Sequence, residues 1–164
     1  MLFRSLLANE ACGFGRQLPS YDFASANVIV SLGADFLGSW LSPVEFAKGY
    51  SVGRKIDAKN PRMSKHYQFE SYLSLTGSSA DERFVHRPSQ TGTVALALLS
   101  ALNGGAVALS DAKLKAGVEK VAADLNKNKG KGLVVCGSND KNVQIVVNAI
   151  NQAIGSFGIG RAHV

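Results

Sequence analysis

Short apolar runs alternate along the chain with longer segments in which apolar residues recur at helical spacing. Val28–Leu32 and Gly132–Cys136 are apolar on both faces, which is typical of strands buried inside a parallel sheet. Lys65–Ser71 alternates aromatic with polar residues, and this alternation predicts a third strand that is half-buried. A short fourth strand is expected at 83–87, where Pro88 would end it.

Helix signals lie between and after these predicted strands. Ser42 before Pro43, with Glu45 in the first turn, predicts a helix that runs to about Gly53. Three further helices are expected at 92–102, 111–125 and 140–154. Leu6–Ser20 is rich in glycine and contains a proline, so it is predicted to be a loop.

The alternation of strands and helices predicts a three-layer, Rossmann-like α/β domain with a mainly parallel sheet. The 164 residues are 46% hydrophobic and 18% charged, which indicates one folded domain rather than a disordered segment. No apolar run reaches the roughly 18 to 20 residues that a membrane-spanning helix needs. The longest run, 94–109, is interrupted by Asn103-Gly-Gly105, so we expect no membrane span in this segment.

The two ends of the chain have an unusual coding property. Met1–Ser5 can be encoded by GTGCTCTTCCGATCT and Ile159–Val164 by ATCGGAAGAGCACACGTC, and these strings are largely reverse complements that match a sequencing adapter. We therefore expect 1–5 and 159–164 to be artefacts and 6–158 to be part of a longer protein. Without Arg4 and Arg161 the net charge falls from +6 to +4, which is weak evidence for any partner.

Residues suited to metals or nucleic acids are sparse. Cys12 and Cys136 are far apart, with no Cys-x-x-Cys and no His/Cys cluster, so we expect no metal or iron–sulfur site in this segment. Basic and aromatic residues are not interleaved, so no nucleic-acid partner is expected. Phe36 and Trp40 are expected to anchor a core or an interface.

Two turns follow predicted strands at the positions where α/β sheets bind ligands. Gly33-Ala-Asp35 follows the first strand, but the Asp35 carboxylate would repel a pyrophosphate unless it binds a hydroxyl instead, so a tight turn is the preferred interpretation. Gly137-Ser-Asn139 follows the last strand and could cradle a phosphate. The preferred interpretation is that Ser138 or Asn139 is an ordinary helix cap.

Other polar groups allow a functional and a structural interpretation. His66, Glu70 and His86 could act as acid–base or ligand groups, but nothing in the sequence links them, and a hydrogen-bonded structural role is preferred. A basic run consists of Lys48, Arg54, Lys55, Lys59, Arg62 and Lys65. It could dock an acidic partner, and a solvated loop is the commoner explanation.

The stretch Tyr21–Gly92 resembles one family, the molybdopterin-oxidoreductase-like subunit of alternative complex III, a bacterial quinol-oxidising complex. The segments that carry the resemblance are Asn27–Leu32, Gly33–Asp35, Phe36–Phe46, Met63–Ser71, Leu75–Gly77, Ala80-Asp81 and Pro88–Gly92. The resemblance extends over about 21–158 and is strongest in 22–55 and 65–90. It implies the Rossmann-like fold that the strand and helix pattern predicts.

The same resemblance identifies the positions that would meet a pterin dinucleotide, namely Gly33, Asp35, Ser89, Gln90 and Thr91. Molybdenum-dependent relatives have Pro-Gly-Thr-Asp-Gly in the guanine-binding loop, where this chain has Pro88-Ser-Gln-Thr-Gly92. An amide and hydroxyls do not replace a carboxylate that accepts two hydrogen bonds from guanine. These positions are therefore expected to be vestigial, with no catalytic residue and no cofactor in this segment.

The resemblance implies a scaffold or docking domain that is inactive alone. Its expected partners are the other subunits of a membrane respiratory complex, including a multihaem cytochrome, on the periplasmic side of the bacterial inner membrane. Iron–sulfur clusters are implied elsewhere in the full-length protein. Two alternatives stay open: a molybdenum bis-pterin oxidoreductase that binds the dinucleotide, and a generic Rossmann-like binding module that uses 137–139.

Overall fold

The computed structural model describes every residue except 1, 14, 16–19, 57, 59–60 and 157–164. Its centre is a four-stranded sheet in the order β3-β2-β1-β4, in which all neighbouring strands are parallel. The strands are β1 (Val28–Leu32), β2 (Lys65–Glu70), β3 (Glu82–Val85) and β4 (Gly132–Cys136). The predicted α/β architecture is therefore confirmed.

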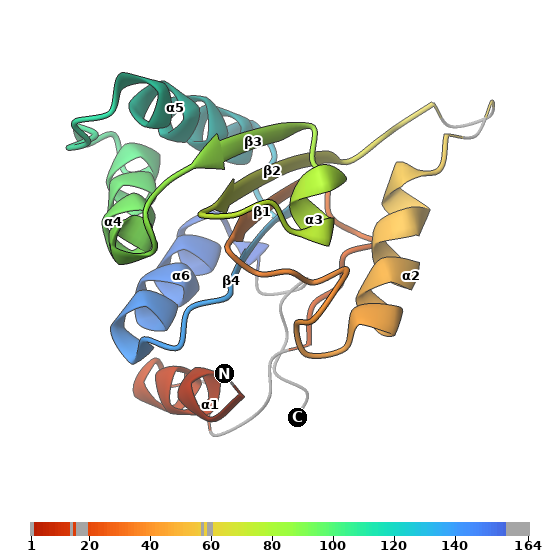
Figure 1. The fold of residues 1–164 in the computed structure, drawn as a ribbon, viewed down its shortest axis with the longest axis horizontal. Coiled ribbons are helices and arrows are strands. Elements are labelled where there is room, and N and C mark those ends of the chain that lie inside the picture. Colours follow the sequence, from red (N-terminus) through yellow and green to blue (C-terminus); the bar gives the residue numbers. More distant parts are fainter. Residues whose placement is uncertain (1, 14, 16–19, 57, 59–60, 157–164) are drawn as a thin grey trace.

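Helices cover both faces of this sheet (Figure 1). One face carries α4 (Thr91–Leu102), α5 (Ala112–Lys127) and α6 (Lys141–Ala153), and the other carries α2 (Pro43–Arg54). The short helices α3 (Leu75–Ser78) and η1 (Pro88–Gln90) follow β2 and β3. Within the described part of the chain, no helix combines the length and the apolar character needed to cross a bilayer.

The pleat of the strands divides the buried residues into two cores. Val30 and Phe69 belong to the core that lies under α4, α5 and α6. Ile29 belongs to the core on the opposite face, together with Phe36 and Trp40 from the segment before α2. Phe36 and Trp40 are thus core residues, which is one of the two roles expected for them.

The predicted strand boundaries agree closely with the structure, except at β3. β3 occupies Glu82–Val85 rather than 83–87. It ends early because its partner ends early: Glu70, the last residue of β2, pairs with Val85. His86 and Arg87 then turn the chain toward η1 and the start of α4.

The prediction of a loop over Leu6–Ser20 is wrong for its first part. α1 (Leu2–Ala11) is a helix that packs on α6, and Asn148 of α6 donates a hydrogen bond to Asn9 Oδ1 at 3.0 Å. Ala8 is fully buried in this contact region. Gly13, with φ of +80°, ends the helix, and the packing on α6 is a tertiary contact that local patterns do not reveal. The predictions for 16–19 and 159–164 concern positions outside the described residues.

β4 is an edge strand whose free side is occupied by side chains that follow it in the sequence. The Ser156 hydroxyl donates to Gly132 O at 2.5 Å, and the Gln144 amide donates to the carbonyl oxygen of the strand's last residue at 3.1 Å. Between them, Asn151 Oδ1 accepts from Val134 N at 3.0 Å and Asn151 Nδ2 donates to Val134 O at 2.8 Å. Asn151 therefore reproduces the two hydrogen bonds that a neighbouring peptide group would make.

Candidate functional site

The carboxyl ends of β1 and β4 lie side by side, and the chain leaves them toward opposite faces of the sheet (Figure 1). Open α/β sheets bind ligands at such a switch point. A cavity of about 270 Å³ lies there. Its wall includes a residue from the carboxyl end of each strand: Gly33, Glu70, His86 and Gly137.

Gly33 and Gly137 bring the two loops of the switch point into direct contact. Gly33 has φ of +68°, and its N–H donates to Phe69 O at 2.7 Å. Gly137 N–H donates to Leu32 O at 3.0 Å, and a Cβ at Gly137 would overlap the carbonyl oxygen of Gly33. Glycine is needed at Gly33 for its positive φ and at Gly137 for this close approach.

Asp35 serves the protein rather than the cavity. Its Oδ1 accepts hydrogen bonds from Thr76 N at 3.0 Å and from Thr76 Oγ1 at 2.8 Å. The Thr76 oxygen in turn accepts from Leu37 N at 2.9 Å. The carboxylate thus binds a hydroxyl of its own chain and joins the loop after β1 to α3.

The loop that resembles a guanine-binding loop also uses its polar side chains internally. Gln90 Oε1 accepts from Arg87 N at 3.0 Å, and Thr91 Oγ1 donates to Pro88 O at 3.0 Å. Ser89 is exposed, and its hydroxyl has no hydrogen-bond partner in the part of the chain that the structure describes. Of Ser89, Gln90 and Thr91, only Thr91 belongs to the wall of the cavity.

The turn at 137–139 differs from the preferred interpretation. Neither Ser138 nor Asn139 caps the next helix, because the N-cap of α6 is Asp140, whose carboxylate accepts from Asn142 N at 2.8 Å. Ser138 Oγ instead accepts from Asp140 N at 3.1 Å. A carboxylate already satisfies the positive end of the helix, which makes this turn less suited to phosphate.

A row of buried polar side chains runs along β2 on the face of the sheet that α2 covers. Tyr50 Oη lies 3.1 Å from His66 Nδ1, and His66 Nε2 lies 3.3 Å from Gln68 Oε1. The Gln68 amide then donates to Glu70 Oε2 at 3.1 Å. No pattern in the sequence links His66 to Glu70, whereas the structure connects them through Gln68. The prediction that β2 is half-buried is therefore wrong, because hydrogen bonds allow its polar face to be buried as well.

Glu70 ends this row at the wall of the cavity and is 3% exposed. Besides Gln68, its carboxylate binds the Ser74 hydroxyl at 2.6 Å and the Arg83 guanidinium. Burial raises the pKa of Glu70, but the hydrogen bonds from Ser74, Arg83 and Gln68 outweigh it and hold the pKa below its usual 4.5. The Glu70 carboxylate also packs directly against Gly77, where a Cβ would overlap Glu70 Oε1. Glu70 is thus a charged group whose oxygens are already in use.

His86 differs from the other polar residues of the cavity wall. It is 5% exposed, and its Nδ1 lies 2.8 Å from Arg87 O. Its Nε2 is buried and has no hydrogen-bond partner among the described residues. The backbone places it beside Glu70, since His86 N donates to Glu70 O at 3.2 Å. His86 therefore has one buried ring nitrogen without a hydrogen-bond partner in the described part of the chain.

The buried His66 is expected to make the free energy of unfolding fall as the pH is lowered. Burial, with a smaller contribution from the charge of Arg54, lowers the pKa of His66 from 6.5 to about 4. The unfolded chain therefore binds a proton that the folded chain does not, between pH 6.5 and 4. We expect this group to remove about 3 kcal/mol from the free energy of unfolding as the pH falls through that window.

Urea denaturation at several pH values tests this prediction. The variant His66→Gln carries no titratable group at this position, so its stability is expected to fall less between pH 6.5 and 4. Equal pH slopes for the variant and the unmodified protein would contradict the assigned protonation of His66.

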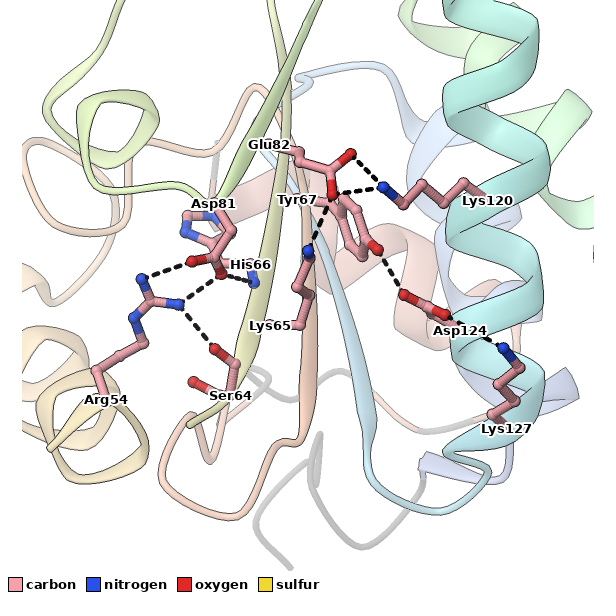
Figure 2. Close-up of polar contacts among 10 residues, drawn as sticks. All are labelled: Arg54, Ser64, Lys65, His66, Tyr67, Asp81, Glu82, Lys120, Asp124 and Lys127. Atoms are coloured by element: carbon pink, nitrogen blue, oxygen red, sulfur yellow. Dashed lines mark hydrogen bonds and ion pairs between the residues drawn. The ribbon is translucent and has the colours of Figure 1, made fainter. Parts of the chain in front are cut away.

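Ion pairs at the amino-terminal edge of the sheet involve Arg54 and Lys65 of the basic run (Figure 2). Arg54 Nη1 lies 2.6 Å from Asp81 Oδ2. Glu82 contacts Lys65 at 2.9 Å and Lys120 at 2.7 Å. Two residues of the basic run are therefore paired with acidic residues that are distant in the sequence.

The rest of the basic run is divided between exposed and undescribed positions. Lys48, Lys55 and Arg62 are exposed, and Lys59 lies outside the described residues. Docking of an acidic partner on this surface stays a prediction. Because Arg54 and Lys65 are paired, such a partner would meet Lys48 on α2 and Lys55 and Arg62 in the loop that follows.

Metal ligands are not gathered anywhere in the described part of the chain. No group of three or more His, Cys, Asp or Glu side chains has a suitable arrangement there. Cys12 and Cys136 are both free thiols. In comparisons with known proteins, neither a family model nor a curated protein matches the chain.

Proposed function

We propose that this chain is a scaffold domain of the molybdopterin-oxidoreductase-like subunit of a quinol-oxidising respiratory complex of the alternative complex III type, and that it holds no pterin dinucleotide. The iron–sulfur clusters would lie in another region of the full-length protein. Its partners would be the other subunits, including a multihaem cytochrome, at the periplasmic side of the inner membrane. The basis for the family is the resemblance of Tyr21–Gly92, and the basis for the missing cofactor is local geometry.

The observation that carries the proposal is the internal use of the vestigial cofactor positions. The Asp35 carboxylate accepts two hydrogen bonds from Thr76, and Gln90 accepts one from Arg87 N. A dinucleotide would have to compete with these contacts, which are made at no cost in translational entropy. The polar groups that a cofactor would use therefore support the fold instead.

The rival function is a molybdenum bis-pterin oxidoreductase that binds its dinucleotide at Gly33, Asp35 and 89–91. In favour of it, Gly33 and Thr91 line the cavity at the switch point. Against it, the loop lacks the carboxylate that guanine recognition requires, and Ser89 is exposed away from any partner in the described chain. The scaffold is the better supported of the two functions.

Purification of the full-length protein from detergent-extracted membranes tests the proposal. We expect haem-containing subunits to co-purify in stoichiometric amounts, as measured by haem absorbance, and molybdenum and pterin to be substoichiometric by mass spectrometry and pterin fluorescence. Stoichiometric molybdenum and pterin would overturn the loss of the cofactor. Absence of any haem subunit would overturn the assignment to a respiratory complex.

Ser89→Ala is a matched variant for the same experiment. The Ser89 side chain makes no hydrogen bond in the described part of the chain, so the variant should leave the fold unchanged. We expect unchanged haem content and quinol oxidation in the purified complex. A drop in pterin content or in activity would favour the enzyme.

A further inference from the structure

Asn103 combines the local chemistry and the exposure that favour spontaneous loss of a side-chain amide. It is the only asparagine of the sequence that precedes a glycine. Its side chain is exposed, and the amide makes no hydrogen bond in the part of the chain that the structure describes. A glycine has no side chain to shield its backbone nitrogen, so this nitrogen can reach the carbonyl carbon of the preceding side chain. The pair Asn103-Gly104 is therefore a candidate site of chemical modification.

The backbone around Gly104 leaves room for this attack. Asn103 is the C-cap of α4, and Gly104 follows it with φ of +77°. A Cβ built on Gly104 would meet no atom of the described chain within 4 Å, so the space beside this residue is open. A hollow of about 480 Å³ borders Gly104 and Gly105 and gives water access to the same peptide groups. The attacking nitrogen and the water for a later hydrolysis are thus both available.

Hydrogen bonds at the end of α4 determine how often the attacking geometry forms. Gly104 N donates to Ala101 O at 3.1 Å, and Gly105 N donates to Ser100 O at 2.8 Å. Ser100 Oγ donates in turn to Ala106 O at 3.0 Å. Helix ends fray, so these bonds open more often than those inside the helix. The reaction is therefore expected in the folded protein, at a rate that depends on the opening of this last turn.

We propose that Asn103 is a site of spontaneous deamidation, and that the modification weakens the end of α4. The Gly104 nitrogen attacks Asn103 Cγ, the bond from Cγ to the side-chain nitrogen breaks, and this nitrogen leaves as ammonia with the proton from Gly104. Water then adds its hydroxyl to either carbonyl carbon of the cyclic imide and returns a proton to the nitrogen, which yields aspartate or isoaspartate. This modification goes beyond the scaffold function, which would stand with or without it.

Both products place a carboxylate at the C-cap of α4. The carbonyl end of a helix carries partial negative charge, so the new charge is unfavourable there. Isoaspartate also inserts a methylene group into the backbone, which displaces the N–H groups of Gly104 and Gly105 from their acceptors. Val107 follows in the same loop and is buried in the core under α4, α5 and α6. The modification is therefore expected to loosen the connection between α4 and α5.

Incubation of the purified protein at mildly alkaline pH, followed by peptide mass spectrometry, tests the site. We expect the peptide that contains Asn103 to gain about 1 Da and to contain isoaspartate. Asn126 is the internal control, because it is exposed near the end of α5 but precedes Lys127. Asn103 should be modified at least roughly tenfold faster than Asn126, whose neighbour shields its backbone nitrogen. Equal rates at the two positions would overturn the proposal.

Asn103→Gln is the matched variant for the chemistry. Glutamine keeps the amide but adds a methylene group, so its cyclic imide forms far more slowly. We expect no mass gain at this position over the same period. Isoaspartate forms only through the imide, so a product from the unmodified protein that is entirely aspartate would overturn the attack by Gly104.

Gly105→Ala tests the dependence on the last turn of α4. A Cβ at Gly105 would overlap Ser100 Oγ and lie 3.2 Å from Ser100 O, the acceptor of Gly105 N. The turn should open more often, and we expect Asn103 to be modified roughly two- to tenfold faster. Gly49→Ala, inside α2, should leave the rate unchanged. Equal rates for the two variants would overturn the role of this turn.

Asn103→Asp reproduces one product and tests the consequence for the fold. We expect Tm to fall by roughly 1 to 4 °C, because the carboxylate lies at the carbonyl end of α4. Salt screens this interaction, so the difference in Tm should shrink at high ionic strength. A variant as stable as the unmodified protein would overturn the weakening of α4.

Discussion

Gly137→Ala is expected to lower the free energy of unfolding by about 3 to 5 kcal/mol, the range of severe single substitutions. The new Cβ would overlap the carbonyl oxygen of Gly33, which is a backbone atom and cannot rotate away as the end of a side chain can. The loops after β1 and β4 would then separate, and the hydrogen bond from Gly137 N to Leu32 O at 3.0 Å would be strained or lost. Urea denaturation followed by circular dichroism measures the effect.

Gly49→Ala provides the matched control. Gly49 lies inside α2, and a Cβ there would meet its nearest neighbour, Ala24 N, at an ordinary distance of 3.5 Å. Alanine favours the helix over glycine by about 1 kcal/mol, so this variant should be as stable as the unmodified protein or more stable. If Gly137→Ala unfolds at the same urea concentration as Gly49→Ala, the close contact between the two loops is wrong.

Arg83→Met is expected to cost about 2 kcal/mol at pH 7, because it leaves the charge of Glu70 buried without its cation. Glu70 is 3% exposed, whereas the Arg83 side chain is 30% exposed, so water will offset part of the loss. Ser74 and Gln68 still donate to Glu70 in this variant. The midpoint of urea denaturation should fall accordingly.

The pH dependence of the Arg83→Met effect identifies its cause. In the unmodified protein the pKa of Glu70 is below 4.5, so its charge contributes stability above pH 4.5 that is lost as the pH falls through the folded pKa. Without Arg83, burial raises the folded pKa, and protonation relieves the penalty at acid pH. The difference between the two proteins should therefore shrink below pH 4.5, and a constant difference would contradict the buried-charge explanation.

Arg62→Met is the control for removal of an arginine. Arg62 is exposed and makes no ion pair in the described part of the chain. Its replacement should change the free energy of unfolding by less than about 0.5 kcal/mol at any pH. A loss equal to that of Arg83→Met would assign the effect to net charge rather than to Glu70.

The architecture was predictable because it depends on local patterns. Val28–Leu32 and Gly132–Cys136 are strands in the structure with the predicted bounds, since apolar residues on both faces require a buried parallel strand. The helix after Ser42 begins at Pro43, as proline at the first position predicts. α1 could not be predicted in the same way, because contacts with α6 stabilise it.

The candidate site was only partly predictable, because its residues are joined by contacts between distant segments. Gly33 was identified from the turn that follows a buried strand, a purely local signal. His86 and Glu70 were recognised as polar candidates, but their shared cavity depends on the pairing of β2 with β3. Asp35 was expected to disfavour a pyrophosphate beside a tight turn, and no pattern in the sequence identifies Thr76 as its hydrogen-bond partner.

The side chains along the free edge of β4 affect the tendency of the protein to aggregate. An unpaired edge of a parallel sheet is a template on which another chain can add a strand. Asn151 fills that template at Val134, and Ser156 fills it at Gly132. Loss of the C-terminal segment would uncover an apolar edge and favour strand exchange between molecules. Asn151 of α6 and Ser156, which follows α6, thus protect this edge of the folded protein against aggregation.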